Sequence, residues 1–424
     1  MATSRGPNGE LVLGGVALGG IARDARYGTP SYVYDLDAIA SEARELDAAF
    51  ESAPHLVAYA VKANSAGPIV KALAEANCGA DVVSGAELVL AQRCGVRADR
   101  IVYSGVAKTD DELDLAIGAG IAAIQVESVE EIPRIAARAR AQNRTANVSL
   151  RINPGVDADE LDTHSYIATG HDDAKFGVPL VSMPSALEEL GKASSVRLAG
   201  IGAHVGSQFT TTDAYIASAR ALFGIAKEVR TRFPLSFLDT GGGFGIDYGQ
   251  GCPVRPADFI RATRRLQGEL GLGDLALYSE PGRSLVGAHG VLVARVIQRK
   301  VAEPRRWTMI DAGMNDLMRP ALYQAHHRIV PIGATAGSPK PYRVVGPVCE
   351  SSDDFGLHDL PDGDLDFVAI LDAGAYGYSM ASRYNGRALP AEVFLRGGRV
   401  ALASVRAARE EWVDDRLRAV AISS

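Results

Sequence analysis

The stretch Tyr59-Ala60-Val61-Lys62-Ala63-Asn64 decides how the rest of the chain is interpreted. It ends an apolar run that begins at Leu56, and Pro54 and Gly67-Pro68 flank it, which predicts a short buried strand. Burying an ammonium group is costly unless the group is paired or used chemically. Lys62 at the strand end is therefore either a side chain that reaches solvent or the amine of a Schiff-base site. The residues around it in the fold must decide.

Length and composition bound the class of protein. The 424 residues suffice for two domains, and 47% hydrophobic with 22% charged residues is ordinary for a globular protein. A net charge of −7 argues against nonspecific binding to nucleic acid or to anionic membranes. The four cysteines are widely spaced, without a CxxC pair, which predicts a reduced cytoplasmic protein with no metal site.

Short apolar runs alternate with amphipathic helical patterns over the first two thirds of the chain. Eight such runs predict a parallel (β/α)8 barrel over residues 30–284 rather than an open sheet. The predicted strands are the run from Leu56 that leads to Lys62, and residues 78–84, 101–105, 123–128, 147–154, 198–206, 237–243 and 275–282. Thr109…Glu112 and Ser128…Glu131 predict capping boxes at two of the helices.

Polar residues gather where these strands end. They are Lys62, Asp81, Ser84, Ser104, Glu127, Arg151, His204, Gly241–Gly243 and Glu280. Each has a structural explanation of its own, as Ser84 does as a helix N-cap with Glu87. The carboxyl ends of barrel strands form the face that carries active sites, so their recurrence there predicts a site.

The remaining sequence predicts a second, β-rich sandwich or barrel domain made of residues 1–29 and 285–424. Its predicted strands are residues 290–301, 307–311, 342–345, 367–371 and 392–403, followed by a charged helix near residues 407–417. The segment before Pro30 also has strand character and is expected to join this domain.

Two motifs of the barrel suit an anionic, planar cofactor. Consecutive glycines in Gly241–Gly243 allow backbone N–H groups to approach a phosphate, although a tight strand–helix turn explains them as well. Glu280 in Glu280-Pro281-Gly282-Arg283 could pair with a pyridine nitrogen or brace a turn with Arg283. His204 could stack on a planar ring or be a core histidine. His326-His327 is interpreted as structural.

The β-rich region carries three further motifs. Cys349 beside Glu350 lies in a Gly-Pro turn context that suits a proton donor, although most lone cysteines are inert. Arg319 in Met318-Arg319-Pro320 could grip a carboxylate with two hydrogen bonds. The segment 372–378 is a glycine-punctuated turn with tyrosine hydroxyls.

Taken in order along the chain, these motifs resemble the pyridoxal-phosphate-dependent decarboxylases built on an alanine-racemase-like barrel, and among them the diaminopimelate decarboxylase family. The similarity spans residues 28–400. Its motifs are YAVKAN, HVGSQ, GGGFGIDY, EPGRS, MRPALY, GPVCES and DAGAYGYSMASRYN. Ala86 stands where the family usually has a second glycine in SGGEL.

The resemblance implies a role for each matching residue. Lys62 is the Schiff-base lysine, His204 stacks on the pyridoxal ring and Glu280 holds its nitrogen. The other implied residues are Asp81, Ser207, Gly242, Gly243 and Tyr376 for the cofactor, and Arg283, Arg319, Tyr323, Glu350 and Tyr376 for the substrate. Cys349 is the implied proton donor. In the family Cys349 and Glu350 come from the partner subunit, so the resemblance also implies a homodimer.

The implied reaction is decarboxylation of meso-2,6-diaminopimelate to L-lysine and CO2, the last step of lysine biosynthesis. Two alternatives remain open: a decarboxylase of another basic amino acid (ornithine, arginine or carboxynorspermidine) and a non-catalytic cofactor-binding homologue. A racemase is disfavoured, because related racemases place an arginine where this chain has Glu280.

Overall fold

The computed structural model describes residues 3–154, 175–252, 254–334 and 336–418. The chain forms two compact units. One comprises Ile39–Asp247 and Gly251–Leu285, and the other Met1–Ala38, Tyr248–Gln250 and Val286–Ser424. Within the described residues, no helix combines the length and the apolar character needed to cross a membrane.

The first unit contains, within its described part, eight parallel strands that close into a barrel because β8 pairs with β9. The strands are β5 (His55–Ala60), β6 (Gly79–Val82), β7 (Ile101–Tyr103), β8 (Ala123–Val126), β9 (Ala146–Asn153), β11 (Val196–Gly202), β12 (Phe237–Asp239) and β13 (Ala276–Ser279). The short β10 (Val178–Pro179) adds to β9. The predicted barrel is thus confirmed.

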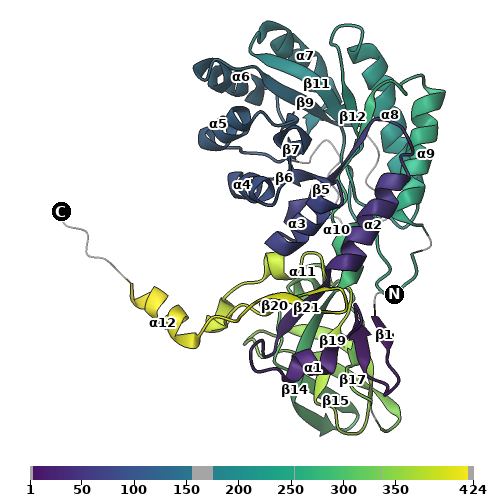
Figure 1. The fold of residues 1–424 in the computed structure, drawn as a ribbon, viewed down its shortest axis with the longest axis vertical. Helices are drawn as coiled ribbons and strands as arrows, with labels where there is room; N and C mark the ends of the chain where they lie inside the picture. Colours follow the sequence, from purple (N-terminus) through teal and green to yellow (C-terminus); the bar gives the residue numbers. More distant parts are fainter. Residues whose placement is uncertain (1–2, 155–174, 253, 335, 419–424) are drawn as a thin grey trace. The chain divides into compact units, whose positions relative to one another are not determined.

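Amphipathic helices cover the outside of this barrel (Figure 1). They are α2 (Leu36–Ala48), α3 (Gly67–Glu75), α4 (Gly85–Arg93), α5 (Asp110–Ala119), α6 (Glu131–Ala141), α7 (Met183–Lys192), α8 (Asp213–Val229) and α9 (Pro256–Glu269). The capping box of Thr109 and Glu112 is present. The one expected at Ser128 is wrong: α6 has Glu130 as its N-cap, and Glu131 instead accepts hydrogen bonds from Lys108 Nζ and Glu127 N.

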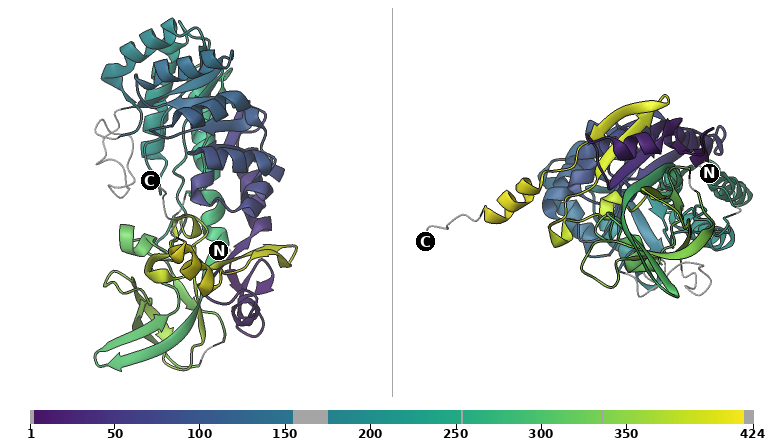
Figure 2. Two further views of the ribbon diagram at one scale, coloured as in Figure 1. Left: turned by 90° about the vertical axis from the view of Figure 1, so that its left-hand side faces the viewer. Right: turned by 90° about the horizontal axis from the view of Figure 1, so that it is seen from below.

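The second unit is built on a bent sheet with the strand order β18-β17-β15-β14-β4-β20-β21. Its elements are β4 (Ser31–Asp35), β14 (Gly290–Ala302), β15 (Arg305–Ile310), β16 (Ile329–Pro331), β17 (Pro339–Val345), β18 (Asp354–Pro361), β19 (Phe367–Ile370), β20 (Ala391–Arg396), β21 (Arg399–Ser404), α11 (Arg319–Tyr323) and α12 (Arg409–Leu417). The long β14 pairs with β4 and β19 through its first half and with β15 through its second. Helix α12 projects from the sheet and buries none of its residues (Figure 2).

Strand β4 extends the β-rich unit beyond the domain boundary expected at residue 30. It pairs antiparallel with β14 and parallel with β20, so backbone hydrogen bonds place residues 31–35 in the β-rich unit. The small sheet of β1 (Thr3–Arg5), β2 (Leu11–Leu13) and β3 (Val16–Ala17) with helix α1 (Leu18–Arg23) belongs to the same unit. Apolar side chains of β2, α1, β4, β14, β19 and β20 form its core.

A buried carboxyl in this unit makes its stability dependent on pH. Burial raises the pKa of Glu392 from 4.5 to about 7, although Tyr34 Oη donates a hydrogen bond to it. A raised pKa means that the stabilising contribution is complete below pH 4.5 and is lost as the pH rises through 7. Between pH 4 and pH 8 the free energy of unfolding of Glu392→Gln should therefore increase by about 3 kcal/mol relative to that of the parent.

Urea unfolding of the two proteins at pH 4, 6 and 8 checks this expectation. The midpoints should lie closest at pH 4, and the variant's should exceed the parent's increasingly as the pH rises. A difference in midpoint that does not change with pH contradicts it.

Candidate active site

Lys62 lies directly after β5, in the 3-10 turn Val61–Ala63. Its Nζ donates a hydrogen bond to Asp81 Oδ2 at 2.5 Å, from the neighbouring strand β6. Asp81 is fully buried, and its other oxygen, Oδ1, has no hydrogen-bond partner among the described residues. A buried carboxylate oxygen without a partner is costly and points to a group that binds there. The structure thus brings Lys62 and Asp81, two residues that the sequence places at strand ends, into direct contact.

His204 follows β11 and faces the glycine run. Its Nδ1 accepts a hydrogen bond from Gly242 N at 3.2 Å, which assigns the remaining proton to Nε2. Burial, followed by the positive charges of Arg151 and Lys62, lowers the pKa of His204 well below 6.5. The imidazole is therefore neutral at physiological pH, a state suited to stacking on a planar ring.

Glu280 ends β13 and is one of a pair of buried carboxyls. Burial, with the negative charges of Asp239 and Asp81, raises the pKa of Glu280 well above 4.5. Burial also raises the pKa of Asp239 to about 6, partly offset by hydrogen bonds from Gly241 N and from Glu280. Burial and the neighbouring carboxylates therefore favour the proton-carrying form of Glu280. A buried carboxyl in that state can exchange its proton with a ring nitrogen bound beside it.

The glycine run after β12 is required by close backbone contacts. Gly241 and Gly243 have φ of +67° and +92°, which side chains rarely adopt. A Cβ atom at Gly242 would overlap the carbonyl oxygen of Glu280, and one at Gly243 would overlap that of Gly206. Close packing of the backbone thus explains these glycines, as the strand–helix turn alternative expects, and the N–H groups of Gly241 and Gly242 donate to Asp239 Oδ1 and His204 Nδ1.

Gly242→Ala should destabilise the barrel, because the added methyl group collides with the backbone of Glu280. We expect a loss of about 1–3 kcal/mol in the free energy of unfolding and weaker cofactor retention. Thermal unfolding and cofactor titration measure both effects. The matched control is Gly224→Ala, at an exposed position of α8 with nothing within 4 Å, which should gain roughly 0.5–1 kcal/mol. Equal effects of the two substitutions contradict the expectation.

Arg283 and Ser207 are brought together in the barrel unit. Arg283 follows β13 and is buried, and its Nη2 donates a hydrogen bond to Ser207 Oγ at 3.1 Å. Ser207 follows His204 in the loop after β11. Two residues predicted for different roles, one for the substrate and one for the cofactor, thus share a contact.

The other predicted residues belong to the β-rich unit. Cys349 and Glu350 are exposed in the loop between β17 and β18. Cys349 N donates to Asn385 Oδ1 at 2.9 Å, and Tyr384 Oη donates to Glu350 Oε1 at 2.6 Å. Adjacent residues of one 3-10 turn therefore hold the backbone of the thiol residue and the carboxylate beside it.

Arg319, Tyr323 and Tyr376 occupy two neighbouring features of the same unit. Arg319 is the buried first residue of α11, and Tyr323 is the half-buried last. Tyr376 lies in the predicted glycine-punctuated turn, half-buried and with φ of +55°. A positive φ at a tyrosine is uncommon and is often found at functional sites.

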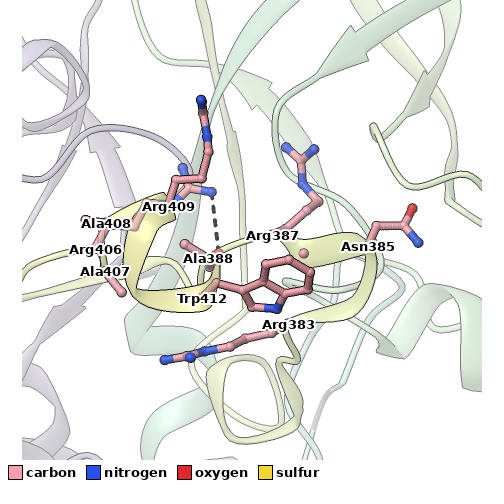
Figure 3. Close-up of a pocket in the computed structure, with 10 residues that line it drawn as sticks. Arg383, Asn385, Arg387, Ala388, Arg406, Ala407, Ala408, Arg409 and Trp412 are labelled. Carbon is pink, nitrogen blue, oxygen red and sulfur yellow. Dashed lines mark hydrogen bonds between the residues drawn. The ribbon is translucent and has the colours of Figure 1, made fainter. Parts of the chain in front are cut away.

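A cavity of about 370 Å³ lies in this unit beside the turn that holds Cys349 (Figure 3). Arginines dominate its wall, together with Trp412 of α12 and Asn385. None of the residues predicted from the sequence lines it. It shares only Asn385, which accepts a hydrogen bond from Cys349 N, with the contacts described above.

The structure also reveals contacts that the sequence did not assign. Arg151 forms a buried ion pair with Glu127 at 3.1 Å, and its Nη2 donates to the carbonyl oxygen of His204 at 3.5 Å. Gln125 Nε2 donates to Asp239 at 3.1 Å. The signal for these residues was a charged or amide side chain within an apolar strand, which is costly unless it is paired.

Comparison with known proteins places the barrel in a class. Residues 36–287 match the family described as "Pyridoxal-dependent decarboxylase, pyridoxal binding domain". Two curated diaminopimelate decarboxylases are each 39% identical. That of Pseudomonas aeruginosa aligns over 92% of both chains, and that of Zymomonas mobilis over 96% of this chain and 97% of its own.

Solved structures agree with the sequence relatives. Diaminopimelate decarboxylase from Helicobacter pylori, complexed with L-lysine, is 36% identical with a TM-score of 0.85 and covers 92% of this chain and 97% of its own. The enzyme from M. jannaschi is 33% identical with a TM-score of 0.90 and 97% coverage of both chains. The chain belongs to the diaminopimelate decarboxylase family, which confirms the resemblance inferred from the ordered motifs.

Proposed function

We propose that this protein decarboxylates meso-2,6-diaminopimelate to L-lysine and CO2, the last step of lysine biosynthesis, with pyridoxal 5'-phosphate as its cofactor. The carrying observation is Lys62 held by the buried Asp81 at the carboxyl end of a family-typical barrel. Named relatives at 39% identity over most of the chain support the same activity.

The described residues fit pyridoxal phosphate at three points. Asp81 Oδ1 is buried without a hydrogen-bond partner among the described residues, the raised pKa of Glu280 favours its proton-carrying form, and the Gly241–Gly243 run brings backbone without side chains against His204 and Glu280. When bound, the cofactor supplies an aldehyde for covalent attachment of amines and an electron sink for the pair left when CO2 departs.

Each residue then has a task that its environment supports. Lys62 supplies the amine that attaches the cofactor, and His204, neutral, packs on the ring. Glu280 would share its proton with the ring nitrogen, and the attraction between the two groups would be strong because water is excluded. Gly242, Gly243, Ser207 and Tyr376 hold the phosphate.

Substrate recognition and the final proton transfer fall to the remaining residues. Arg283, Arg319 and Tyr323 bind carboxylates, and Glu350 accepts a hydrogen bond from the distal ammonium group. Cys349 delivers a proton to the carbon that has lost CO2. We further propose a homodimer in which Cys349 and Glu350 act in the site of the partner subunit. Both residues are exposed in this chain, which supports the proposal.

We also propose a cytoplasmic location for the protein. All four cysteines are free thiols, and two of them are partly exposed and one exposed. Free thiols persist in a reducing compartment, which supports this location.

The test of the function is CO2 release by the cofactor-loaded protein with meso-diaminopimelate, ornithine, arginine and lysine offered in parallel. We expect turnover of meso-diaminopimelate alone, with lysine as the product. Turnover of another amino acid would support decarboxylation but show that the substrate specificity inferred from Arg319 and Glu350 is wrong. Cofactor bound at Lys62 without turnover of any substrate would exclude the proposal in favour of a binding protein.

A further inference from the structure

Arg319 is held on two sides within the β-rich unit. Its Nη1 contacts His327 Nε2 at 2.6 Å, and its guanidinium carbon lies 4.8 Å from the centre of the Tyr248 ring. Arg319 and His327 are both buried, with 6% and 2% of their surface exposed. An arginine between an imidazole and an aromatic ring has few rotamers left, so its direction is fixed by its neighbours.

The hydrogen bonds of His327 determine its protonation. Its Nδ1 lies 2.9 Å from the carbonyl oxygen of Leu371, which can only accept, so Nδ1 carries the proton. An arginine N–H can only donate, so Nε2 of His327 must present a lone pair to Arg319. His327 is therefore a neutral acceptor that orients the guanidinium without neutralising its charge. Its ring and that of Tyr248 meet in a T-shaped arrangement, with ring centres 5.2 Å apart.

We propose that His327 is a positioning residue: it directs Arg319 at the substrate carboxylate that remains in the product. This inference rests on the proposed function. A carboxylate that departs as CO2 loses its charge, so an ion pair to it would stabilise the substrate more than the transition state and slow the reaction. An immobilised arginine is better used on the carboxylate that keeps its charge throughout. His327, expected from the sequence to be structural, thereby becomes part of substrate selection.

Two substitutions at His327 separate its two hydrogen bonds. In His327→Asn the amide nitrogen can replace Nδ1 and donate to Leu371, but the side chain is too short to reach Arg319. In His327→Gln the amide oxygen can replace Nε2 as the acceptor for Arg319. We expect His327→Asn to raise KM for meso-diaminopimelate about tenfold with little change in kcat, and His327→Gln to restore most of the difference.

Binding of two small molecules provides a readout without turnover. L-lysine carries the retained carboxylate, whereas 1,5-diaminopentane is the same chain without it. His327→Asn should weaken binding of L-lysine about tenfold and leave 1,5-diaminopentane unchanged. Equal weakening of both ligands, or a glutamine variant no better than the asparagine variant, overturns the proposal.

The control is His326→Asn at the adjacent position. His326 is exposed and stacks on His358 with ring centres 5.7 Å apart, so the substitution should leave KM and the affinities for both ligands unchanged. Thermal unfolding identifies variants that do not fold. If His327→Asn does not fold, His327→Gln is the only test. A glutamine variant that still binds L-lysine more tightly than 1,5-diaminopentane supports the proposal, and one that has lost this preference overturns it. If the parent fails to decarboxylate meso-diaminopimelate, the proposed function fails, while the ligand preference still tests His327.

Discussion

Lys62→Ala should lower kcat for CO2 release at least about a thousandfold, because it removes the amine to which the cofactor is proposed to attach. The structure gives the physical reason in the contact with Asp81, whose second oxygen is buried without a hydrogen-bond partner among the described residues. The measurement is the initial rate at saturating substrate. Borohydride treatment followed by mass analysis of the Lys62 peptide reports attachment of the cofactor independently of turnover.

Lys108→Met is the matched control for this variant. Lys108 is another barrel lysine, but unlike the part-exposed Lys62 it is buried, paired with Glu131 at 2.9 Å, and donates to the carbonyl oxygen of Gln125. Removing it leaves Glu131 buried without its partner, so stability should fall while the cofactor stays attached to Lys62. A Lys62→Ala enzyme that keeps a tenth of the parent's rate is incompatible with the proposed role.

Glu280→Gln is expected to have the second largest effect, a fall in kcat of about a hundredfold. Glutamine has nearly the same shape and can still meet Ser104, whose Oγ lies 3.4 Å from Glu280 Oε1. It cannot give a proton to the ring nitrogen and become a carboxylate, so the electron sink is weakened. Steady-state rates and the visible spectrum of the bound cofactor measure the loss.

Asp239→Asn tests the buried carboxyl pair of Glu280 and Asp239 by changing its second member. It removes the negative charge that, after burial itself, raises the pKa of Glu280 most. The pKa of Glu280 should fall, and kcat should decrease less than in Glu280→Gln because a carboxyl still faces the ring. Full activity of Glu280→Gln would show that this carboxyl does not serve the ring nitrogen.

The barrel could be predicted because its signal is local. Each strand is a short apolar run between helical patterns, and a chemistry-bearing residue such as Lys62, His204 or Glu280 follows it. The order of these motifs along the chain then indicated the family. Both the closed barrel and the type of reaction could therefore be predicted from local sequence.

The β-rich unit was harder to predict, because its strands mix polar and apolar residues. Strand β18, DFGLHDLP, contains glycine, a histidine and two aspartates, and it was missed, as was the three-residue β16. Strand β4 was not predicted as an element of its own. Its sheet could not be inferred, because hydrogen bonds to β14 and β20 lie far away in sequence.

Side-chain pairings were the least predictable part of the site. The histidine pair 326–327 has no ligand-like spacing, and only the fold brings His327 to Arg319. Glu131 matched a capping pattern with Ser128, yet it pairs with Lys108 because burying that ammonium group without a partner would cost more than leaving a helix end uncapped.

The position of β4 between β14 and β20 has a consequence for synthesis on the ribosome. About 360 residues separate the end of β4 from the end of β20, and adding them takes roughly 20 to 70 s at ~5–20 residues per second. Until β14 is made, from Gly290 onward, β4 has neither of its neighbouring strands, and it then still lacks β20, whereas each barrel strand soon gains its first neighbour. The early strand is therefore an exposed edge for which shielding by a chaperone has the most value.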